Sequence, residues 1–328
     1  MNKTTYSSNE PMQDSIADLV EPCFLVGAER SGTTLFRLML DHHPDLAFHS
    51  EFEFAVDLLE DGRFPDMDAY HAFLETDRVF QLTGHDVDQS LAYPELVHSF
   101  LEQKRLKDGK TMVGATVHRH FDRLLSIWPH ARFIHILRDP RDVARSNLKM
   151  GWSGNVYFGV DRWIEAEETW ERLKSTLDSD RYMEVRYLDL VTNTEGVLRE
   201  ACQFLGVEFS EQMFEYADSS TYDLPDARAL RQWEKKLSAN EVRWIEAKAQ
   251  DMMQRRGFSV TTESPQKVGV LESLYLRIHD FVILKRARVQ RFGFLNLAGH
   301  FVTRRLGLVG LEKRIKLRMN EVQNQQIK

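Results

Sequence analysis

The sequence predicts an α/β fold: a P-loop-like parallel sheet flanked by helices, with a C-terminal helical extension. Two short apolar runs, Cys23–Val26 and Arg132–Leu137, have the composition of buried strands. Each run leads into a turn and then into a helical pattern, and this alternation is typical of parallel sheets. Residues 263–328 instead mix basic and apolar residues in the manner of amphipathic helices.

The chain of 328 residues is long enough for one large α/β domain with an appendage. We expect a flexible N-terminus over residues 1–20, the α/β domain over residues 21–262 and the extension over residues 263–328. Within the domain, residues 53–108 read as a helical insertion, which is a candidate lid over a substrate.

Several absences in the sequence predict a soluble, cytoplasmic protein. Residues 1–20 lack the apolar stretch of a signal peptide, and no run of 18 apolar residues suggests a transmembrane helix. The two cysteines, Cys23 and Cys202, both lie in apolar surroundings, which argues against a disulfide framework.

The first motif (residues 27–34) follows the first predicted strand and reads GAERSGTT. Its frame, two glycines five positions apart and then two hydroxyl residues, is that of a nucleotide P-loop. Thr33, however, stands where the P-loop lysine is expected. A positive charge is present inside the loop as Arg30. A strand, a glycine-rich loop and a helix N-terminus together favour an anion, so we expect a phosphate site.

The second motif (residues 138–146) follows the second predicted strand and reads RDPRDVARS. Asp139 is a suitable helix N-cap, and Pro140 fits the first helical position. Arg138 therefore lies between a strand end and a helix start, which is the usual ligand edge of an open α/β sheet.

Taken together, the two motifs resemble those of the sulfotransferases that use 3′-phosphoadenosine-5′-phosphosulfate (PAPS). The stretch ERSGTTLFRLMLDHHPDLAFHSEFEF is similar to the bacterial and tyrosylprotein-sulfotransferase-like branch of this family. Weaker similarity continues through EVRYLDLV, ACQFLGVEF and LRQWEKKLS. The resemblance implies a PAPS-dependent sulfotransferase that transfers a sulfuryl group to a hydroxyl or amine.

The resemblance also implies which residues bind the donor. The first motif corresponds to the family's 5′-phosphosulfate loop, and Arg138 with Ser146 corresponds to its 3′-phosphate motif. Tyr187 falls at a turn that contributes to the nucleotide site, although Asp189 replaces the usual glutamate there. The expected donor-binding residues are Arg30, Ser31, Gly32, Thr33, Thr34, Leu35, Arg138, Ser146 and Tyr187.

The acceptor needs a base that removes its proton, and Glu51 is the first candidate. Glu51 lies 21 residues after Arg30, where the resemblance places the catalytic glutamate of the tyrosylprotein branch. Its neighbour Ser50 replaces an acidic residue often found in the family. We therefore expect Glu51 as the base and Arg30 as a second catalytic residue that stabilises the leaving group.

Residues 113–120 depart from the family, because the lysine that commonly helps to stabilise the transferring group is absent. His118, Arg119 or His120 could take over this role. His118 is also the rival base, since other branches use a histidine from this region. His49, in contrast, reads as a residue near the end of the first helix.

Two other classes of function stay open on the sequence alone. One is a P-loop-like kinase or phosphotransferase, against which the missing lysine argues. The other is a non-catalytic relative that binds PAPS or its product. No metal site is expected, because the sulfuryl donor has no β/γ-phosphate chain for a metal ion to clamp.

The extension differs from the rest of the chain in charge. Residues 265–328 hold 13 Lys and Arg against 4 Asp and Glu, a net charge of about +9, whereas the remaining residues hold 30 against 46, about −16. Such helices either pack on the domain or a second subunit, or contact an anionic membrane peripherally. The acceptor is expected to be a small molecule, a glycan or a lipid. Nucleic acid is not expected, because the whole chain carries a net charge of −7.

Overall fold

A computed structural model describes residues 21–60, 62–261 and 266–327. Its centre is a five-stranded sheet with the strand order β2-β3-β1-β4-β5, in which every neighbouring pair is parallel. The strands are β1 (Cys23–Val26), β2 (Leu46–Glu51), β3 (Met112–Val117), β4 (Arg132–Leu137) and β5 (Tyr182–Arg186). The predicted fold class is therefore confirmed, and the two apolar runs are strands β1 and β4.

The strand order creates a switch point beside β1. The chain passes from β1 towards β2 and β3 on one side, and from β4 towards β5 on the other. The segments that follow β1 and β4 consequently diverge in opposite directions above the carboxyl ends of two adjacent strands. Open α/β sheets bind ligands in the crevice at such a point.

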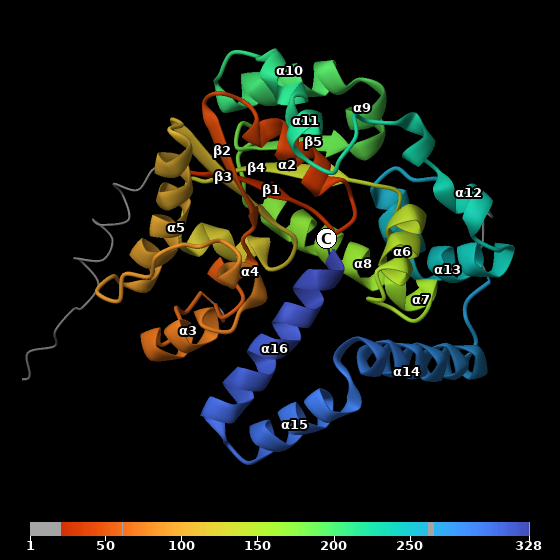
Figure 1. Cartoon of the computed structure of the whole chain (residues 1–328). Helices are drawn as coiled ribbons and strands as arrows, with labels where there is room; N and C mark the ends of the chain where they lie inside the picture. The colour runs from red at the N-terminus through yellow and green to blue at the C-terminus, as the bar shows by residue number, and fades with distance from the viewer. Residues whose placement is uncertain (1–20, 61, 262–265, 328) are drawn as a thin grey trace, which may run out of the picture.

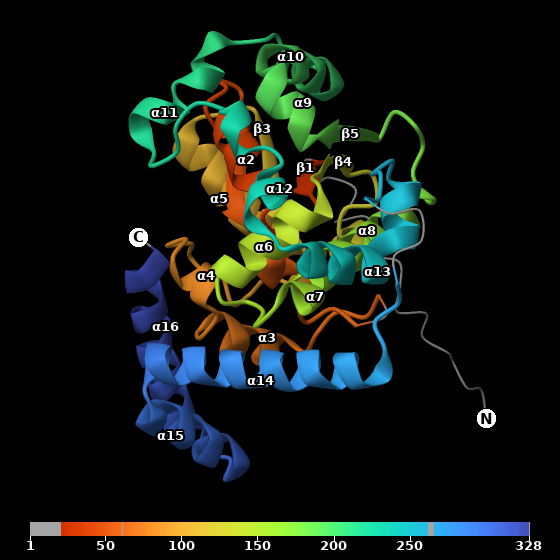
Figure 2. The ribbon, with the colours of Figure 1, turned by 90° about the vertical axis from the view of Figure 1, so that its right-hand side faces the viewer.

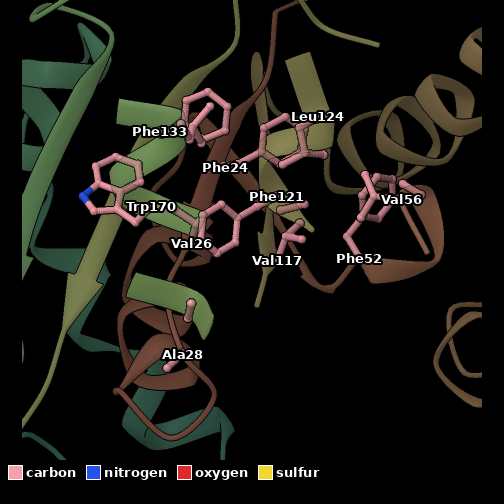
Figure 3. Packing of buried hydrophobic residues seen from close by; sticks show 14 of the residues in the cluster. Phe24, Val26, Ala28, Phe52, Val56, Val117, Phe121, Leu124, Phe133 and Trp170 are labelled. Atoms are coloured by element: carbon pink, nitrogen blue, oxygen red, sulfur yellow. The ribbon is translucent and has the colours of Figure 1, made fainter. Parts of the chain in front are cut away.

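Both faces of the sheet are buried, as the apolar composition of its strands requires. Side chains alternate along β1, so Phe24 and Val26 face one core cluster while Cys23 and Leu25 face the other. Figure 3 shows the first cluster, in which the ring centroids of Phe24 and Phe133 are 6.0 Å apart.

Helices cover the two faces of the sheet. The first cluster is completed by α5 (Tyr93–Asp108), α6 (Pro140–Lys149), α7 (Val156–Gly159), α8 (Asp161–Lys174) and α13 (Ala239–Arg255). The second is completed by α2 (Thr33–Asp41), α9 (Tyr187–Thr192), α10 (Thr194–Leu205) and α11 (Tyr216–Ser219). A further short helix, α12 (Gln232–Lys236), lies beside α6.

Residues 53–108 are largely helical. They form the 3-10 turn η1 (Glu53–Ala55), the helices α3 (Met67–Leu74) and α4 (Arg78–Gln81), and α5. Tyr70 and Tyr93 anchor this segment through hydrogen bonds to the carbonyl oxygens of Phe54 and Ala55. Whether it works as a lid stays a prediction.

The C-terminal extension consists of α14 (Val270–Phe292), α15 (Phe294–Arg305) and α16 (Val309–Ile327). Figures 1 and 2 both show α14 and α15 at the end of the molecule opposite α9 and α10. α16 leads back towards α3 and α4, where Asn320 donates a hydrogen bond to the carbonyl oxygen of Thr76. None of the helices in the described ranges is long and apolar enough to cross a bilayer.

The domain boundaries expected from the sequence stay predictions. The predicted flexible N-terminus, residues 1–20, lies outside the described residues.

Candidate active site

The first motif is a tight turn whose glycines cannot carry side chains. Gly27 and Gly32 have φ angles of 144° and 100°. A Cβ on Gly27 would lie 2.5 Å from the carbonyl oxygen of Ile136, and one on Gly32 would lie 2.3 Å from the ring of Tyr187. Arg30 adopts a left-handed conformation with a φ of 70°, which is uncommon for a residue with a side chain. The turn is therefore shaped by close backbone contacts with β4 and α9.

The turn ends at the N-terminus of α2, where an anion is favoured. The first backbone N–H groups of a helix have no acceptor within the helix, and the helix dipole places partial positive charge there. No side chain caps α2, since its N-cap is Gly32. Ser31 lies beside these groups with its Oγ buried and without a hydrogen-bond partner. Leu35 packs its side chain into the core, so only its backbone is available to a ligand.

The two motifs, far apart in the sequence, lie against each other. Arg30 Nε donates a hydrogen bond of 2.9 Å to Ser146 Oγ on α6. Arg138 donates one of 3.0 Å to the carbonyl oxygen of Arg30, and a second of 3.1 Å to the carbonyl oxygen of Ala229. The switch point explains this meeting, because the segments after β1 and β4 begin at adjacent strand ends.

The positive charge of Arg138 has no direct ion-pair partner among the residues that the structure describes, although it interacts with the nearby Asp142 carboxylate. Arg138 also has its Nε buried without a hydrogen-bond partner. Its guanidinium lies 4.2 Å from the ring centroid of Tyr187, which holds the group in place by a cation–π contact. A half-buried cation with a free donor is suited to a phosphate or carboxylate.

A pocket of about 360 Å³ opens beside Arg138. Aromatic and basic side chains line it together with Tyr187: Arg186, Arg231, Trp233 and Phe258. Trp233 lies on α12, within the stretch LRQWEKKLS, and Phe258 follows α13; neither residue was expected at the site from the sequence. Arg141, the third position after Arg138, supports Trp233 with its guanidinium 3.8 Å from that ring centroid.

A larger open cleft of about 1130 Å³ lies on the other side of the first motif. Arg30, Thr34, Glu51 and His118 all line it, so the predicted catalytic residues share one cavity. Its further basic side chains are Arg37, Arg78, Lys104, Lys107, Lys149 and Arg291. These side chains come from five different elements and have no common motif, so no sequence pattern revealed them.

Glu51, at the end of β2, is accessible to a substrate in the cleft. Its side chain is 51% exposed and faces the cleft, with Arg78 at 3.8 Å. Partial desolvation in the cleft, together with the neighbouring Glu53 carboxylate, raises the pKa of Glu51. A carboxylate with a raised pKa is a stronger base, as general base catalysis requires.

His118, in contrast, is buried with both ring nitrogens engaged. Nε2 lies 3.0 Å from Thr33 Oγ1, and Nδ1 lies 2.6 Å from Glu53 Oε1. Burial alone would lower the pKa of His118, but the Glu53 carboxylate outweighs it and the pKa is raised. Burial alone would raise the pKa of Glu53, but His118 lowers it. Glu53, which no sequence pattern revealed, thus favours the protonated form of His118.

The other candidates for the missing lysine are placed differently. Arg119 pairs with Asp57 at 2.6 Å, and neither Arg119 nor His120 lines the cleft. The expectation for His49 is wrong: it lies within β2, and its Nε2 is 2.8 Å from that of His85. Burial lowers the pKa of His49 to about 3 and that of His85 to about 4, so this pair is neutral.

Metal ligands do not gather in the parts of the chain that the structure describes. No group of three or more His, Cys, Asp or Glu side chains there has the arrangement of a metal site.

Comparison with known proteins relates the chain to sulfotransferases. The profile of the sulfotransferase family matches residues 22–211, which include both motifs and all five strands. Omega-hydroxy-beta-dihydromenaquinone-9 sulfotransferase Stf3 of Mycobacterium bovis is 28% identical over 123 residues, 33% of this chain and 32% of that protein. Protein-tyrosine sulfotransferase 1 of Danio rerio is 24% identical over 215 residues, 60% of this chain and 56% of that protein. The match thus spans about a third to just over half of these relatives' lengths.

A solved structure supports the fold. The sulfotransferase domain from the curacin biosynthetic pathway superposes with a TM-score of 0.53 at 17% identity. The match covers 74% of this chain and 99% of that domain.

Proposed function

Since this chain belongs to the sulfotransferase family, we propose that it transfers the sulfuryl group of PAPS to a hydroxyl or amine of an acceptor. The observation that carries the proposal is the contact between the two motifs, in which Arg30 meets both Ser146 and Arg138. That contact joins two anion-binding features into a single site. PAPS has two anionic groups, a 5′-phosphosulfate and a 3′-phosphate, on one nucleoside.

In this proposal each end of the donor has its own partners. The backbone N–H groups at the start of α2, with Ser31 and Arg30, bind the 5′-phosphosulfate. Arg138 and Ser146 bind the 3′-phosphate. The buried Ser31 Oγ and Arg138 Nε, which lack partners among the described residues, support this fit. The adenine is assigned to the pocket that Tyr187 and Trp233 line.

The chemistry would take place in the cleft. The acceptor oxygen or nitrogen forms a bond to the sulfur, and the bond between sulfur and the 5′-phosphate oxygen breaks. Glu51 accepts the acceptor's proton. Arg30 and the loop N–H groups stabilise the negative charge that develops on the leaving 3′,5′-bisphosphate. No metal ion is part of this proposal, because Arg30 and the loop N–H groups already stabilise the negative charge of the leaving group.

His118 would act by positioning rather than as the base. In its protonated form, which Glu53 favours, it can only donate at both ring nitrogens and would hold Thr33 Oγ1 as an acceptor. The hydroxyl hydrogen of Thr33 is then free to point towards the donor's oxygens. A base must have a free lone pair, which Glu51 has and a protonated His118 does not.

The proposed acceptor is a small molecule, a glycan or a lipid. The names of the relatives include a menaquinone derivative and protein tyrosine as acceptors, which supports an acceptor with a lipidic or phenolic hydroxyl. The volume of the cleft, about 1130 Å³, is consistent with an acceptor larger than the donor's sulfuryl group alone.

The test is a screen of the purified protein with PAPS and mixed alcohols, phenols, amines, glycans and lipids. We expect an acceptor whose mass rises by one SO₃ group, with 3′,5′-bisphosphate formed in equal amount. A parallel reaction with ATP and magnesium is the control. Transfer of phosphate in that control, without sulfuryl transfer from PAPS, would place the chain among phosphotransferases. Nucleotide binding without any transfer would favour a non-catalytic relative.

A further inference from the structure

The C-terminal extension carries an apolar surface that nothing in the described structure covers. Of the 22 exposed large apolar side chains among the described residues, 17 lie between Val270 and Leu311. Soluble monomers rarely expose contiguous apolar surface on this scale, and such surface marks an interaction site.

The apolar side chains of α14 form a stripe along one face. They recur at intervals of one, three, four and seven residues, which are the intervals of one helix face. The members of the stripe are Leu271, Leu274, Tyr275, Ile278, Val282 and Val289. α15 continues the exposed surface with Phe294, Leu295 and Phe301, of which Leu295 is 84% exposed.

Exposed basic side chains border the stripe. By the 100° spacing of helical residues, Arg277, Arg286 and Arg288 fall on its flanks and Lys285 falls within it. Acidic residues are few in the extension, at 4 against 13 Lys and Arg over residues 265–328. An apolar face with a basic border is the pattern of helices that lie in the interface of an anionic bilayer.

The opposite face of α14 is fixed to the α/β domain, so the stripe cannot simply fold back onto the core. Leu276 is buried, and its carbonyl oxygen accepts a hydrogen bond of 2.9 Å from Asn155. Asp280 accepts one of 2.6 Å from the backbone N–H of Gly154. These contacts leave the stripe pointing outwards.

We propose that the outer face of α14 and α15 docks peripherally on a lipid bilayer that carries anionic headgroups. The apolar stripe enters the interface, and the bordering basic residues contact the headgroups. A second copy of the chain is a poorer occupant. A twofold contact would set the same basic border against itself, and like charges at close range repel.

The extension also reaches the cleft, which Arg291 of α14 and Gln323 of α16 help to line. A docked molecule would therefore hold its cleft close to the bilayer. This consequence rests on the proposed function: the acceptor would be a lipid, or would be presented at the lipid surface. The docking itself requires no catalysis.

The experiment is co-sedimentation of the full-length protein with phosphatidylcholine vesicles, with and without phosphatidylglycerol, at low and high salt. We expect binding only to the vesicles with phosphatidylglycerol, and release by salt. Lys285→Gln with Arg286→Gln and Arg288→Gln should weaken binding about 100-fold, at about 5-fold for each lost charge. Leu274→Ser with Ile278→Ser should weaken it by at least about 10-fold.

The matched control is Leu224→Ser, which removes an apolar side chain of similar exposure, 54% against 53% for Leu274, outside the extension. This variant should bind vesicles as the wild type does. Circular dichroism and binding of 3′,5′-bisphosphate establish that each variant is folded. Equal binding to neutral vesicles, or no binding by the folded wild type, would overturn the proposal. A dimer in sedimentation that the Leu274→Ser, Ile278→Ser variant dissociates would also overturn it and assign the face to a second copy.

Because vesicle binding is measured without donor or acceptor, its outcome is independent of whether the chain transfers sulfuryl groups.

Discussion

Replacing Arg138 with alanine should distinguish the contributions of the donor's two phosphates to binding. If Arg138 binds the 3′-phosphate, Arg138→Ala should weaken binding of the 3′,5′-bisphosphate strongly. Adenosine 5′-phosphosulfate lacks the 3′-phosphate and should be affected much less.

The magnitude follows from the contacts of Arg138. Its bonds to the carbonyl oxygens of Arg30 and Ala229 are part of the scaffold, so their loss affects both nucleotides alike. We expect this shared loss to be about 1 kcal/mol, or about 5-fold in Kd. The bond to the 3′-phosphate links two charged groups and is worth about 2–3 kcal/mol more, or about 30- to 150-fold. Only the 3′,5′-bisphosphate loses that second part.

Titration calorimetry of the wild type and Arg138→Ala with both nucleotides measures the two losses. Arg138→Lys is the matched control, because it keeps the charge but loses the planar fork and should recover part of the affinity. Equal losses for the two nucleotides would refute the assignment of the 3′-phosphate to Arg138.

Three further predictions concern the loop and the catalytic groups. Glu51→Gln should lower kcat by about 10²- to 10⁴-fold with PAPS affinity unchanged. The wild-type rate should fall as the pH drops below the raised pKa of Glu51, because only its carboxylate form accepts a proton. If Glu51→Gln is active and His118→Ala is inactive, the base is His118 instead. His118→Gln should lower the free energy of unfolding by about 2–4 kcal/mol near pH 5.5, a pH that lies between the pKa values of Glu and His in the unfolded chain and at which Glu53 and His118 are both charged in the folded protein. Denaturation at several pH values should show this difference shrinking as the pH rises through the raised pKa of His118 or falls through the lowered pKa of Glu53. A difference that does not change with pH would contradict the ion pair. Gly32→Ala should abolish nucleotide binding and lower the free energy of unfolding by about 2–3 kcal/mol, since its Cβ would lie 2.3 Å from an aromatic ring. The control is Gly109→Ala, at a position with a φ of 67° and open space around it, which should lower the free energy of unfolding by only about 1 kcal/mol and bind nucleotide normally. Equal effects of the two substitutions would mean that only the backbone angle matters.

The sequence predicted those parts of the fold that local chemistry decides. The apolar runs of β1 and β4 coincide with the observed strands, and Asp139 caps α6 through the backbone N–H of Arg141 with Pro140 at the first helical position. Each of these features depends only on residues within one turn or one strand. The pairing of the two motifs was predicted from a family resemblance rather than from the residues, because strand order is not local.

The parts that were missed depend on contacts between distant segments. Glu53 binds His118 because β2 and β3 are neighbours in the sheet, and no pattern within either segment reveals this. Trp233 reaches the pocket from the short helix α12, and Phe258 from the segment that follows α13; no local pattern shows that the two meet beside Arg138. The exposed stripe of α14 has the same helical spacing as a buried one, so only the structure distinguishes a face that packs from a face that is uncovered.

The central claim is that the two motifs form one binding site for the sulfuryl donor. A crystal structure of the protein with 3′,5′-bisphosphate tests it most directly. We predict the 5′-phosphate at the backbone N–H groups of residues 31–34, the 3′-phosphate within hydrogen-bond distance of Arg138 and Ser146, and the adenine against Tyr187. A bisphosphate that touches only one of the two motifs, or that binds elsewhere, would contradict the claim.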